Sequence, residues 1–495
     1  ARSERRMSGD ITRRQALTLG AIGAGVLVIG ATGAGLSALQ SESPALAPNP
    51  TGTEGAGGQG WNEPSVVASS AGALELDLTA APADIVVGGA TATMLAYNGT
   101  VPGPTIHLRP GDRFRVRLRN ALADPTNLHT HGLMVSAAGS GDNPFVRVGP
   151  GESFDYEFVL PADHPPGVFW YHPHHHGMVA DQLFAGLYGA IVVDDEDWSR
   201  MPPRVAVVSD VTFDGGSVAQ VSPMDRMTGR TGAMLLTNGR VAPDLTGPAG
   251  SEQRVLIVNA CSSRYLDLRL SGLGARLRGI DSGRRPEAPV DRLLLTPGNR
   301  ADLVLTTPAA PVAMVAAAYD RGRAGMGMMG GASAISPEAV VLTVAPDPRA
   351  RVAAIAPTAS DGIPDLRGRE VAGRRTLTMS MGMGGGAGMR FLIDGRGFDP
   401  ERVDQSVRLG AVEEWTIVNT SPMAHPFHLH VWPMQVIRDG RGEVSGIDVR
   451  DVVDVPAGGA VTVRIAFDRL PARTVYHCHI LDHEDLGMMG VVEVA

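Results

Sequence analysis

Lysine is absent from this chain of 495 residues, in which all 43 basic side chains are arginine, a bias that we attribute to codon usage. Cysteine is almost as scarce: Cys261 and Cys478 are the only two, which excludes a disulfide-stabilised scaffold. Charged residues make up only 19% of the chain, below the usual share of about 25%. The formal charge of −9 also disfavours nucleic acid as a partner, because phosphate contacts need clustered cations.

Long amphipathic helical patterns are missing as well, whereas turn-forming residues are abundant. The chain contains 62 glycines and 36 prolines, more than the usual shares of about 7% and 5%. This composition favours a turn-rich all-β protein. It argues against a helical bundle or a coiled coil.

One strand-like pattern occurs three times in the chain. Residues 113–118, 254–258 and 414–418 have the composition of strands, and an asparagine follows each within two residues. The copies are about 140 to 160 residues apart, which is the length of a whole β-sandwich domain rather than of a short repeat. We therefore expect three tandem β-sandwich domains. The expected order is a low-complexity linker over 41–66, domains over 67–200 and 201–346, a second linker over 347–370 and a domain over 371–495.

The first forty residues have the pattern of an export signal. Arg13 and Arg14 form a twin-arginine pair, and an uncharged stretch runs from residue 15 to residue 41. We expect residues 1–40 to be a twin-arginine signal peptide, which places the protein in the periplasm, at the cell surface or outside the cell. The stretch also reaches the length of about 20 residues that a membrane anchor needs, so a retained N-terminal anchor is the alternative. Its glycines make it weakly apolar, which favours the signal peptide.

Histidine is concentrated in a few places. Of the 14 histidines, 12 lie in four short clusters towards the two ends of the expected folded region. The clusters are His129 and His131; His172, His174, His175 and His176; His425, His428 and His430; and His477, His479 and His483. In a strand, residues i and i+2 point to the same face, so each His-x-His pair presents two imidazoles together. Four such clusters predict metal binding rather than isolated buried histidines.

Cys478 stands between two histidines and points to the identity of the metal. Because successive strand residues face opposite ways, His477 and His479 project together while Cys478 projects to the other side. One strand can therefore hold two metal sites back to back. Imidazole alone suits several metals, but two histidines, one thiolate and a weak thioether are the ligands of a blue-copper site. His425, Cys478, His483 and Met488 provide that set. Cys261 lies in an apolar run and is expected to be a buried, inert thiol.

The four clusters occur in the order seen in multicopper oxidases, and the resemblance extends over about residues 70–495. Its motifs are Leu128-His129-Thr130-His131-Gly132, Trp170-Tyr171-His172-Pro173-His174, His425-Pro426-Phe427-His428-Leu429-His430 and His477-Cys478-His479-Ile480-Leu481-Asp482-His483. The chain resembles the bacterial three-domain enzymes that include copper-resistance cuprous oxidases and laccase-like proteins. The resemblance implies three cupredoxin-like Greek-key domains, O2 as electron acceptor, and four coppers, namely one type 1, one type 2 and a type 3 pair.

The resemblance also assigns ligands by position. The type 1 copper would take His425, Cys478, His483 and the axial Met488. The type 2 copper would take His129 and His428. The type 3 pair would take His131, His172, His174, His430, His477 and His479. His175 and His176 extend the second motif beyond its ligands, and Met489 would replace Met488 if the register slipped by one residue.

The implied reaction is one-electron oxidation at the type 1 copper, followed by transfer through Cys478 to the other three coppers, where O2 becomes two waters. Reduction of O2 also needs protons, so carboxylates are expected near those coppers. Asp142 and Glu484 stand where the bacterial enzymes carry acids, and both are candidates for the proton relay. The alternative is an ordinary loop acid at Asp142 and a solvated acid at Glu484.

Methionines near glycine-rich segments point to a substrate. Thioethers select Cu(I), and a glycine-rich loop cannot bury them as core. The candidates for a Cu(I) site are Met326, Met328, Met329, Met379, Met381, Met383, Met389 and Met423. Met379, Met381 and Met383 also share one face of a possible strand, where methionine would be gap-filling core. Ser421 stands where cuprous oxidases carry an acid, a departure from their pattern.

Three functions are therefore considered. The favoured one is oxidation of Cu(I) to Cu(II) in copper tolerance, and the second is laccase-like oxidation of small aromatic reductants, namely phenols and aromatic amines. The third is copper sequestration without catalysis, against which the complete type 2 and type 3 ligands argue. We expect a monomer that binds O2 and its reductant, with no nucleic-acid partner and no stable membrane insertion apart from the possible N-terminal anchor.

Overall fold

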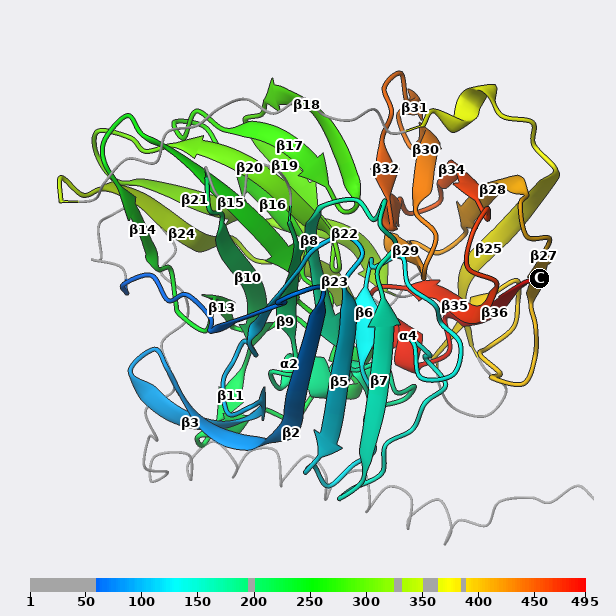
Figure 1. Ribbon diagram of the computed structural model, residues 1–495, viewed down its shortest axis with the longest axis horizontal. Coiled ribbons are helices and arrows are strands. Elements are labelled where there is room, and N and C mark those ends of the chain that lie inside the picture. The colour runs from blue at the N-terminus through cyan, green and yellow to red at the C-terminus, as the bar shows by residue number, and fades with distance from the viewer. Residues whose placement is uncertain (1–58, 195–200, 325–331, 350–363, 384–388) are drawn as a thin grey trace, which may run out of the picture. The chain divides into compact units, whose positions relative to one another are not determined.

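The computed structural model describes residues 59–194, 201–324, 332–349, 364–383 and 389–495. The expected signal peptide, most of the first expected linker and much of the second lie outside these residues, as do Met326, Met328 and Met329. Strands dominate the described chain, and its helices are short (Figure 1). The helical elements are α2 (Val179–Phe184), α3 (Pro223–Thr228), the single 3-10 turn η3 (Leu366–Gly368) and α4 (Leu481–Asp485). None of the described helices has the length and apolar character needed to cross a membrane.

The strands form three β-sandwiches in tandem, which confirms the predicted all-β fold class. The first sandwich pairs a sheet of β1 (Val66–Ala68), β4 (Thr105–Leu108), β9 (Gly189–Val193), β8 (Gly167–His172) and β6 (His129–His131) with a sheet of β11 (Phe213–Asp214), β12 (Ser217–Val218), β3 (Ala90–Tyr97), β2 (Ala73–Val87), β5 (Arg113–Asn120) and β7 (Ser153–Val159). In the chain, β11 and β12 come after the first strand of the second sandwich. They nevertheless extend a sheet of the first sandwich.

The second sandwich is built in the same way. Its sheets are β13 (Met234–Thr237), β10 (Arg204–Val211), β15 (Glu252–Asn259), β20 (Arg300–Thr306), β17 (Arg276–Ile280) and β18 (Gly283–Pro289), and β14 (Asp244–Gly247), β24 (Ala339–Pro346), β21 (Val312–Ala317), β16 (Leu266–Arg269) and β19 (Arg292–Leu295). A separate two-stranded sheet consists of β22 (Tyr319–Ala324) and β23 (Ala332–Ser336).

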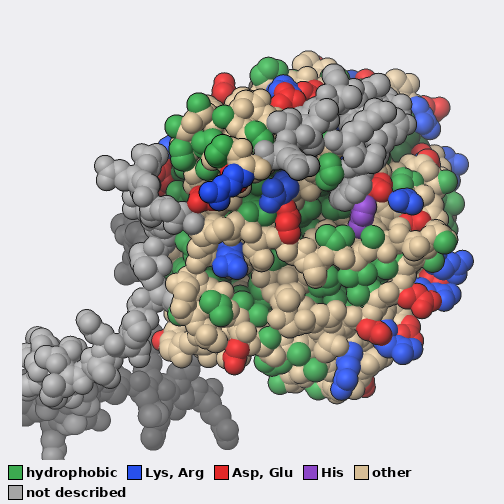
Figure 2. All heavy atoms as spheres, turned by 60° about the vertical axis from the view of Figure 1, so that its left-hand side comes forward, with side chains coloured by type: hydrophobic (Ala, Val, Ile, Leu, Met, Phe, Trp, Pro, Cys, Tyr) green, Lys and Arg blue, Asp and Glu red, His purple; other side chains and the backbone are tan. Residues whose placement is uncertain are grey.

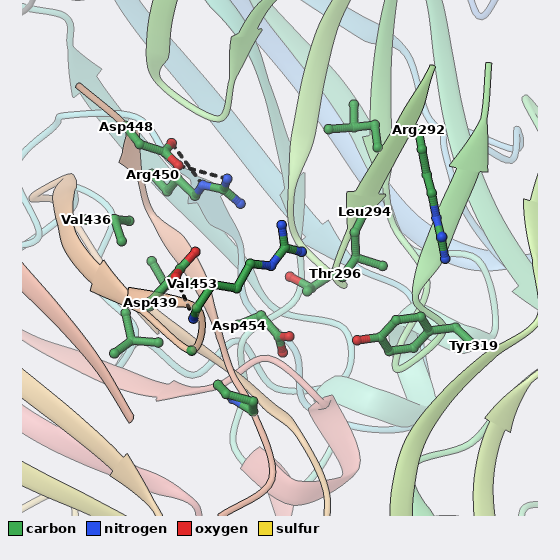
Figure 3. A pocket seen from close by; sticks show the side chains of 15 residues that line it. Arg292, Leu294, Thr296, Tyr319, Val436, Asp439, Asp448, Arg450, Val453 and Asp454 are labelled. Atoms are coloured by element: carbon green, nitrogen blue, oxygen red, sulfur yellow. Dashed lines mark hydrogen bonds and ion pairs between the residues drawn. The ribbon is translucent and has the colours of Figure 1, made fainter. Parts of the chain in front are cut away.

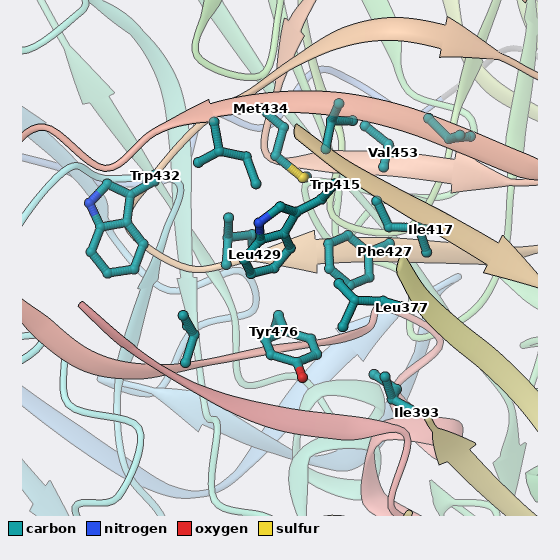
Figure 4. Packing of buried hydrophobic residues seen from close by; sticks show 14 of the residues in the cluster. Leu377, Ile393, Trp415, Ile417, Phe427, Leu429, Trp432, Met434, Val453 and Tyr476 are labelled. Atoms are coloured by element: carbon teal, nitrogen blue, oxygen red, sulfur yellow. The ribbon is translucent and has the colours of Figure 1, made fainter. Parts of the chain in front are cut away.

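The third sandwich carries two of the four histidine clusters. Its sheets are β26 (Met389–Ile393), β25 (Gly373–Met383), β28 (Val412–Asn419), β34 (Ala460–Ala466), β30 (Met434–Asp439), β31 (Gly442–Glu443) and β32 (Val449–Arg450), and β27 (Gln405–Val407), β36 (Met489–Val494), β35 (Ala472–Cys478), β29 (His425–Leu429) and β33 (Val452–Val455). Trp415, Phe427 and Tyr476 pack together in the core between these sheets (Figure 4).

The repeated sequence pattern forms the same strand in each sandwich. These strands are β5, β15 and β28, and each pairs in parallel with the first strand of its own sheet, β2, β10 or β25. Each ends on the repeated asparagine, whose side-chain oxygen accepts the backbone N–H two residues later, at 2.9 Å for Asn120, 3.2 Å for Asn259 and 2.9 Å for Asn419. The asparagine thus fixes the turn after the strand, which explains why the residue recurs.

Candidate metal centre

Strand alternation places Cys478 and its neighbouring histidines on opposite sides of β35. Tyr476 and Cys478 belong to the core of the third sandwich, whereas His477 and His479 turn away from it towards other histidines. The neighbouring strand β29 follows the same rule, because Phe427 faces Cys478 across the ladder and lies in that core. In Figure 1, β6, β29, β35 and α4 lie near one another where the first and third sandwiches meet.

The first group of donors surrounds the Cys478 sulfur. Sγ lies 3.4 Å from His425 Nδ1 and 3.9 Å from His483 Nδ1, and the two nitrogens are 3.2 Å apart. His483 Nε2–H donates to the Met227 carbonyl at 3.2 Å, and His425 Nε2 lies 2.8 Å from the Ser421 hydroxyl. Because a carbonyl can only accept, the proton of His483 is on Nε2 and its lone pair on Nδ1 faces the sulfur. Two imidazoles and a thiol therefore converge with their donor atoms inward.

Burial strongly disfavours the charged forms of this first group. It raises the pKa of the Cys478 thiol and lowers the pKa of His425 to about 3. A bound cation reverses this penalty, since it favours the thiolate and the neutral imidazoles. Met488 is fully buried in the same core cluster as Cys478, whereas Met489 packs in a separate cluster with Val475. This placement supports Met488 as the axial residue, a role that stays a prediction.

The second group consists of eight buried histidines from the first and third sandwiches. His477 Nε2 lies 3.1 Å from His174 Nε2 and 3.2 Å from His430 Nε2, and His479 Nε2 lies 3.3 Å from His131 Nδ1. The remaining members are His129, His172 and His428, and their Nε2 atoms have no hydrogen-bond partner among the described residues. Several sets of three of these nitrogens lie within 4.8 Å of one another. Little histidine surface appears on the face in Figure 2, in keeping with this burial.

Hydrogen bonds to backbone carbonyls fix the orientation of rings in the second group. In three rings, Nδ1–H donates to a backbone carbonyl: His172 to Pro173 at 2.8 Å, His428 to Asp451 at 2.7 Å and His477 to Cys478 at 3.0 Å. These three rings therefore present Nε2 lone pairs to one space, an arrangement suited to binding a cation. Burial is the main cause that lowers the pKa of all eight rings and keeps them neutral. The donor set fits metals that imidazole prefers, copper among them.

Both predicted acids lie against the second group. Asp142 Oδ2 is 2.9 Å from His129 Nδ1, and Oδ1 accepts the Thr130 backbone N–H at 2.8 Å. Burial raises the pKa of Asp142 to about 7. Glu484 Oε2 is 3.2 Å from His477 Nδ1, and burial, with a smaller contribution from the neighbouring Asp485, raises the pKa of Glu484 well above its usual range. Asp142 is thus no ordinary loop acid, and Glu484 is not solvated.

Asp451 contacts the second group but has no counterpart in the sequence-based prediction. Its Oδ1 lies 3.1 Å from His131 Nε2, and Arg300 binds both carboxylate oxygens, at 2.5 and 2.6 Å. Arg300 comes from β20 of the second sandwich and Asp451 from the third. An acid within the apolar pattern Val449 to Val453 is a signal that could have drawn attention to Asp451. No local motif indicates Arg300.

The structure divides the candidate methionines. Met379 is fully buried among core residues such as Leu377 and packs as part of that core. Met389 also packs against this core. Met381, which also packs against this core, and Met423 meet Met227 of α3 and Ala334 in a small cluster. The sequence-based prediction missed Met227, which lies in no methionine-rich segment. Met383 ends β25, and its side chain is outside the described part of the structure.

The remaining four histidines belong to neither donor group. His175 is half-buried and His176 exposed, and both line a cavity of about 350 Å³ beside His174. His107 is paired with Asp194. His164 accepts the Met134 backbone N–H at 3.1 Å and is a buried structural residue. Cys261 is a free, buried thiol, as expected.

Comparison with known proteins gives a consistent family. Family models described as multicopper oxidase match residues 80–197 and 373–495. A multicopper oxidase of Staphylococcus aureus is 26% identical over 420 residues, which cover 82% of this chain and 85% of the relative. A laccase of Bacillus stratosphericus is 26% identical, with 80% and 90% covered. The solved structure of a Campylobacter jejuni multicopper oxidase, described as a metallo-oxidase, superimposes with a TM-score of 0.77 at 28% identity and covers 88% of this chain and 95% of that one.

Proposed function

This chain belongs to the bacterial multicopper oxidases, copper-dependent oxidoreductases with cupredoxin-like domains, and we propose that the reductant it oxidises is Cu(I). The single observation that carries the proposal is the methionine cluster beside the Cys478 group. Met227, Met381 and Met423 come from three separate segments and pack together. Thioethers are soft ligands that prefer Cu(I) to harder cations.

Met227 connects this cluster to the first donor group. Its carbonyl accepts the Nε2–H of His483 at 3.2 Å. Met423 stands two residues before His425 in the sequence. A cuprous ion held by these thioethers is therefore one hydrogen bond away from a predicted copper ligand. This short connection is suited to electron transfer from the substrate.

The contacts of His483 and His425 argue against direct docking of a phenol. A phenol that reduces this site would be expected to contact the outer edge of a ligand imidazole. The Nε2 atom of His483 is occupied by the Met227 carbonyl, and that of His425 by Ser421. The His483 ring is fully buried, and Phe391 stacks on it at a centroid distance of 4.0 Å. Laccase-like oxidation is therefore the second candidate.

The two donor groups have distinct roles in the proposed reaction. Copper at the first group would accept single electrons, and copper at the second would pass them to O2. The residues supply the connection, since Cys478 is bonded through the backbone to His477 and His479, whose rings reach the second group. Asp142 and Glu484 hold protons beside His129 and His477 and are positioned to deliver them as O2 is reduced. Export by the twin-arginine pathway stays a prediction, under which the protein oxidises Cu(I) outside the cytoplasm.

Oxygen uptake by the copper-loaded protein with Cu(I) and with a phenol tests the proposal. The triple variant Met227→Leu, Met381→Leu and Met423→Leu removes the thioethers but keeps the carbonyl of residue 227. We expect uptake with Cu(I) to fall by at least about tenfold, as for lost metal-site contacts, while uptake with the phenol is unchanged. Met314→Leu, a fully buried core change in the second sandwich, is the matched control. Equal losses with both reductants would favour the laccase-like function.

A further inference from the structure

A buried arginine lies beside the Cys478 group without an ion-pair partner among the described residues. Arg321 of β22 is only 2% exposed. Its Nη2 donates to the Thr228 carbonyl at 2.8 Å, whereas Nε and Nη1 have no hydrogen-bond partner among the described residues. An uncompensated buried charge is destabilising by several kcal/mol in typical cases, and buried charges are therefore usually paired.

Other deeply buried arginines of the chain do have partners. Arg264 pairs with Asp210 at 3.1 Å, and Arg300 binds Asp451 through two nitrogens. Two carboxylates interact with Arg321 electrostatically, and both are bound to other groups. Asp482 binds Arg230, and Asp454 accepts the hydroxyl of Tyr265 at 2.8 Å. Arg321 therefore keeps a positive charge that no direct contact neutralises.

The backbone holds Arg321 against the segment that leads to His425. The Arg321 carbonyl accepts the Ala424 N–H at 2.7 Å, and Gly322 forms a bridge to Met423. Gly322 has a φ of +110°, and a Cβ there would lie 2.3 Å from the Pro422 carbonyl oxygen, so only glycine permits this close approach. Strand pairing thus fixes the Arg321 backbone, and the Thr228 carbonyl orients the guanidinium.

Tyrosine rings shield this charge from solvent. The guanidinium lies 5.6 Å from the centre of the Tyr265 ring, and Tyr265 stacks on Tyr319 at 5.1 Å with an interplanar angle of 7°. Tyr319 and Asp454 line a cavity of about 490 Å³ between the second and third sandwiches, in which the Tyr319 hydroxyl points towards Asp454 (Figure 3). Solvent thus reaches the outer tyrosine and not Arg321, and salt screens such a buried charge only weakly.

We propose that Arg321 is a positioning residue that sets the reduction potential of the copper bound by His425, Cys478 and His483. The oxidised site carries one more positive charge than the reduced site, so a fixed cation nearby favours the reduced state. The Arg321 carbonyl accepts the N–H of Ala424, the residue before His425, so strand pairing holds Arg321 beside a ligand of this copper. The proposal requires copper at this group but is independent of whether the reductant is Cu(I) or a phenol.

The test is an equilibrium redox titration of the copper-loaded protein, followed through its visible absorption. In Arg321→Met we expect the equilibrium constant for reduction to fall by about tenfold or more, which for one electron is about 59 mV. Arg321→Lys keeps the charge and should retain most of the native potential. Arg374→Met removes an exposed arginine of the third sandwich and should leave the potential unchanged, because solvent screens that charge.

Thermal unfolding of the metal-free protein separates this role from a structural one. Since Arg321 pairs with no carboxylate in the described part of the chain, Arg321→Met should not lower the unfolding temperature. An unchanged potential in Arg321→Met, with the visible band intact, would overturn the proposal. If that variant does not fold, Arg321→Lys and Arg321→Gln provide the comparison, and equal potentials in these two would likewise overturn it.

Discussion

Single hydrogen bonds determine which imidazole nitrogens are free to bind metal. In both donor groups, an outward ring nitrogen donates to a backbone carbonyl, which cannot itself donate. The donating rings are His172, His428, His477 and His483. Their inward nitrogens are therefore lone-pair donors before any metal binds. Such outer contacts also orient the ligands of metal sites in general.

Asp451 is expected to act on the second group through His131. In Asp451→Asn, the anionic partner of His131 Nε2 and of Arg300 is lost. We predict that O2 uptake falls by about 10- to 100-fold, while the visible band of the Cys478 group persists. Asp448→Asn is the control, since Asp448 pairs with Arg450 near the same strand and forms no hydrogen bond or ion pair with a histidine of the described residues. If O2 uptake fell equally in the two variants, the decrease would follow from the loss of any ion pair and not from the contact with His131.

His164 is expected to make stability depend on pH. Burial lowers the pKa of His164 to about 4, whereas an unfolded histidine titrates at about 6.5. The unfolded state thus binds the proton first, so the stability contribution is present above pH 6.5 and is lost as the pH falls towards 4. The shift corresponds to about 3 kcal/mol in total.

The variant His164→Gln keeps a side-chain acceptor for the Met134 N–H but does not titrate. We predict that its unfolding free energy approaches or exceeds that of the native chain as the pH falls from 7 to 4.5, because only the native chain loses this contribution. Denaturant unfolding of both metal-free proteins across this range is the measurement. Parallel pH profiles would contradict the prediction.

The histidine strands show what local sequence can predict. Period-two alternation separates Cys478 from His477 and His479, and β29 adds His428 to the same side as His477. The repeated strand that ends on asparagine can likewise be predicted from local sequence alone. The contacts of Met227 and Arg321 are different, because each depends on a strand or helix that packs from elsewhere in the chain. No periodic pattern could have predicted them.

The short helix α4 joins parts that are distant in sequence. Asp482 binds Arg230 of the second sandwich, with its shortest contact at 2.6 Å. Asp485 accepts backbone N–H groups of Gly177 and Ala180 at the start of α2, at 2.7 and 2.9 Å. Between these acids, His483 faces the sulfur and Glu484 faces the second donor group. Five residues therefore link both donor groups to two other sandwiches.

Loss of one buried partner of this helix should destabilise the fold. Asp482→Asn removes the buried anionic partner of Arg230, which is 2% exposed and keeps only the half-buried Asp181, at 2.8 Å. We predict a loss of about 1 to 3 kcal/mol. The matched control is Asp163→Asn, which removes an exposed ion pair with Arg469 between the first and third sandwiches and should leave stability nearly unchanged. Thermal unfolding of the metal-free variants measures both. A similar effect of the two changes would contradict the role given to α4.

Across the whole molecule, the metal centre depends on all three sandwiches. The first and third supply the histidines, and the second supplies Met227, Arg230, Arg300 and Arg321. Gly298 of the second sandwich also lies so close to His479 that a Cβ there would be 2.9 Å from Nε2. Because the second sandwich contains no histidine, sequence patterns indicated no part for it in the two donor groups. Its contribution arises only from how the sandwiches pack.

The central claim is that β35 joins two copper groups through Cys478. Metal analysis and visible absorption of the native protein and of Cys478→Ser test it most directly. We predict four coppers and an intense visible band in the native protein, and loss of the band and of one copper in the variant, together with its O2 uptake. A variant that keeps the band, or a native protein that binds only zinc, would contradict the account.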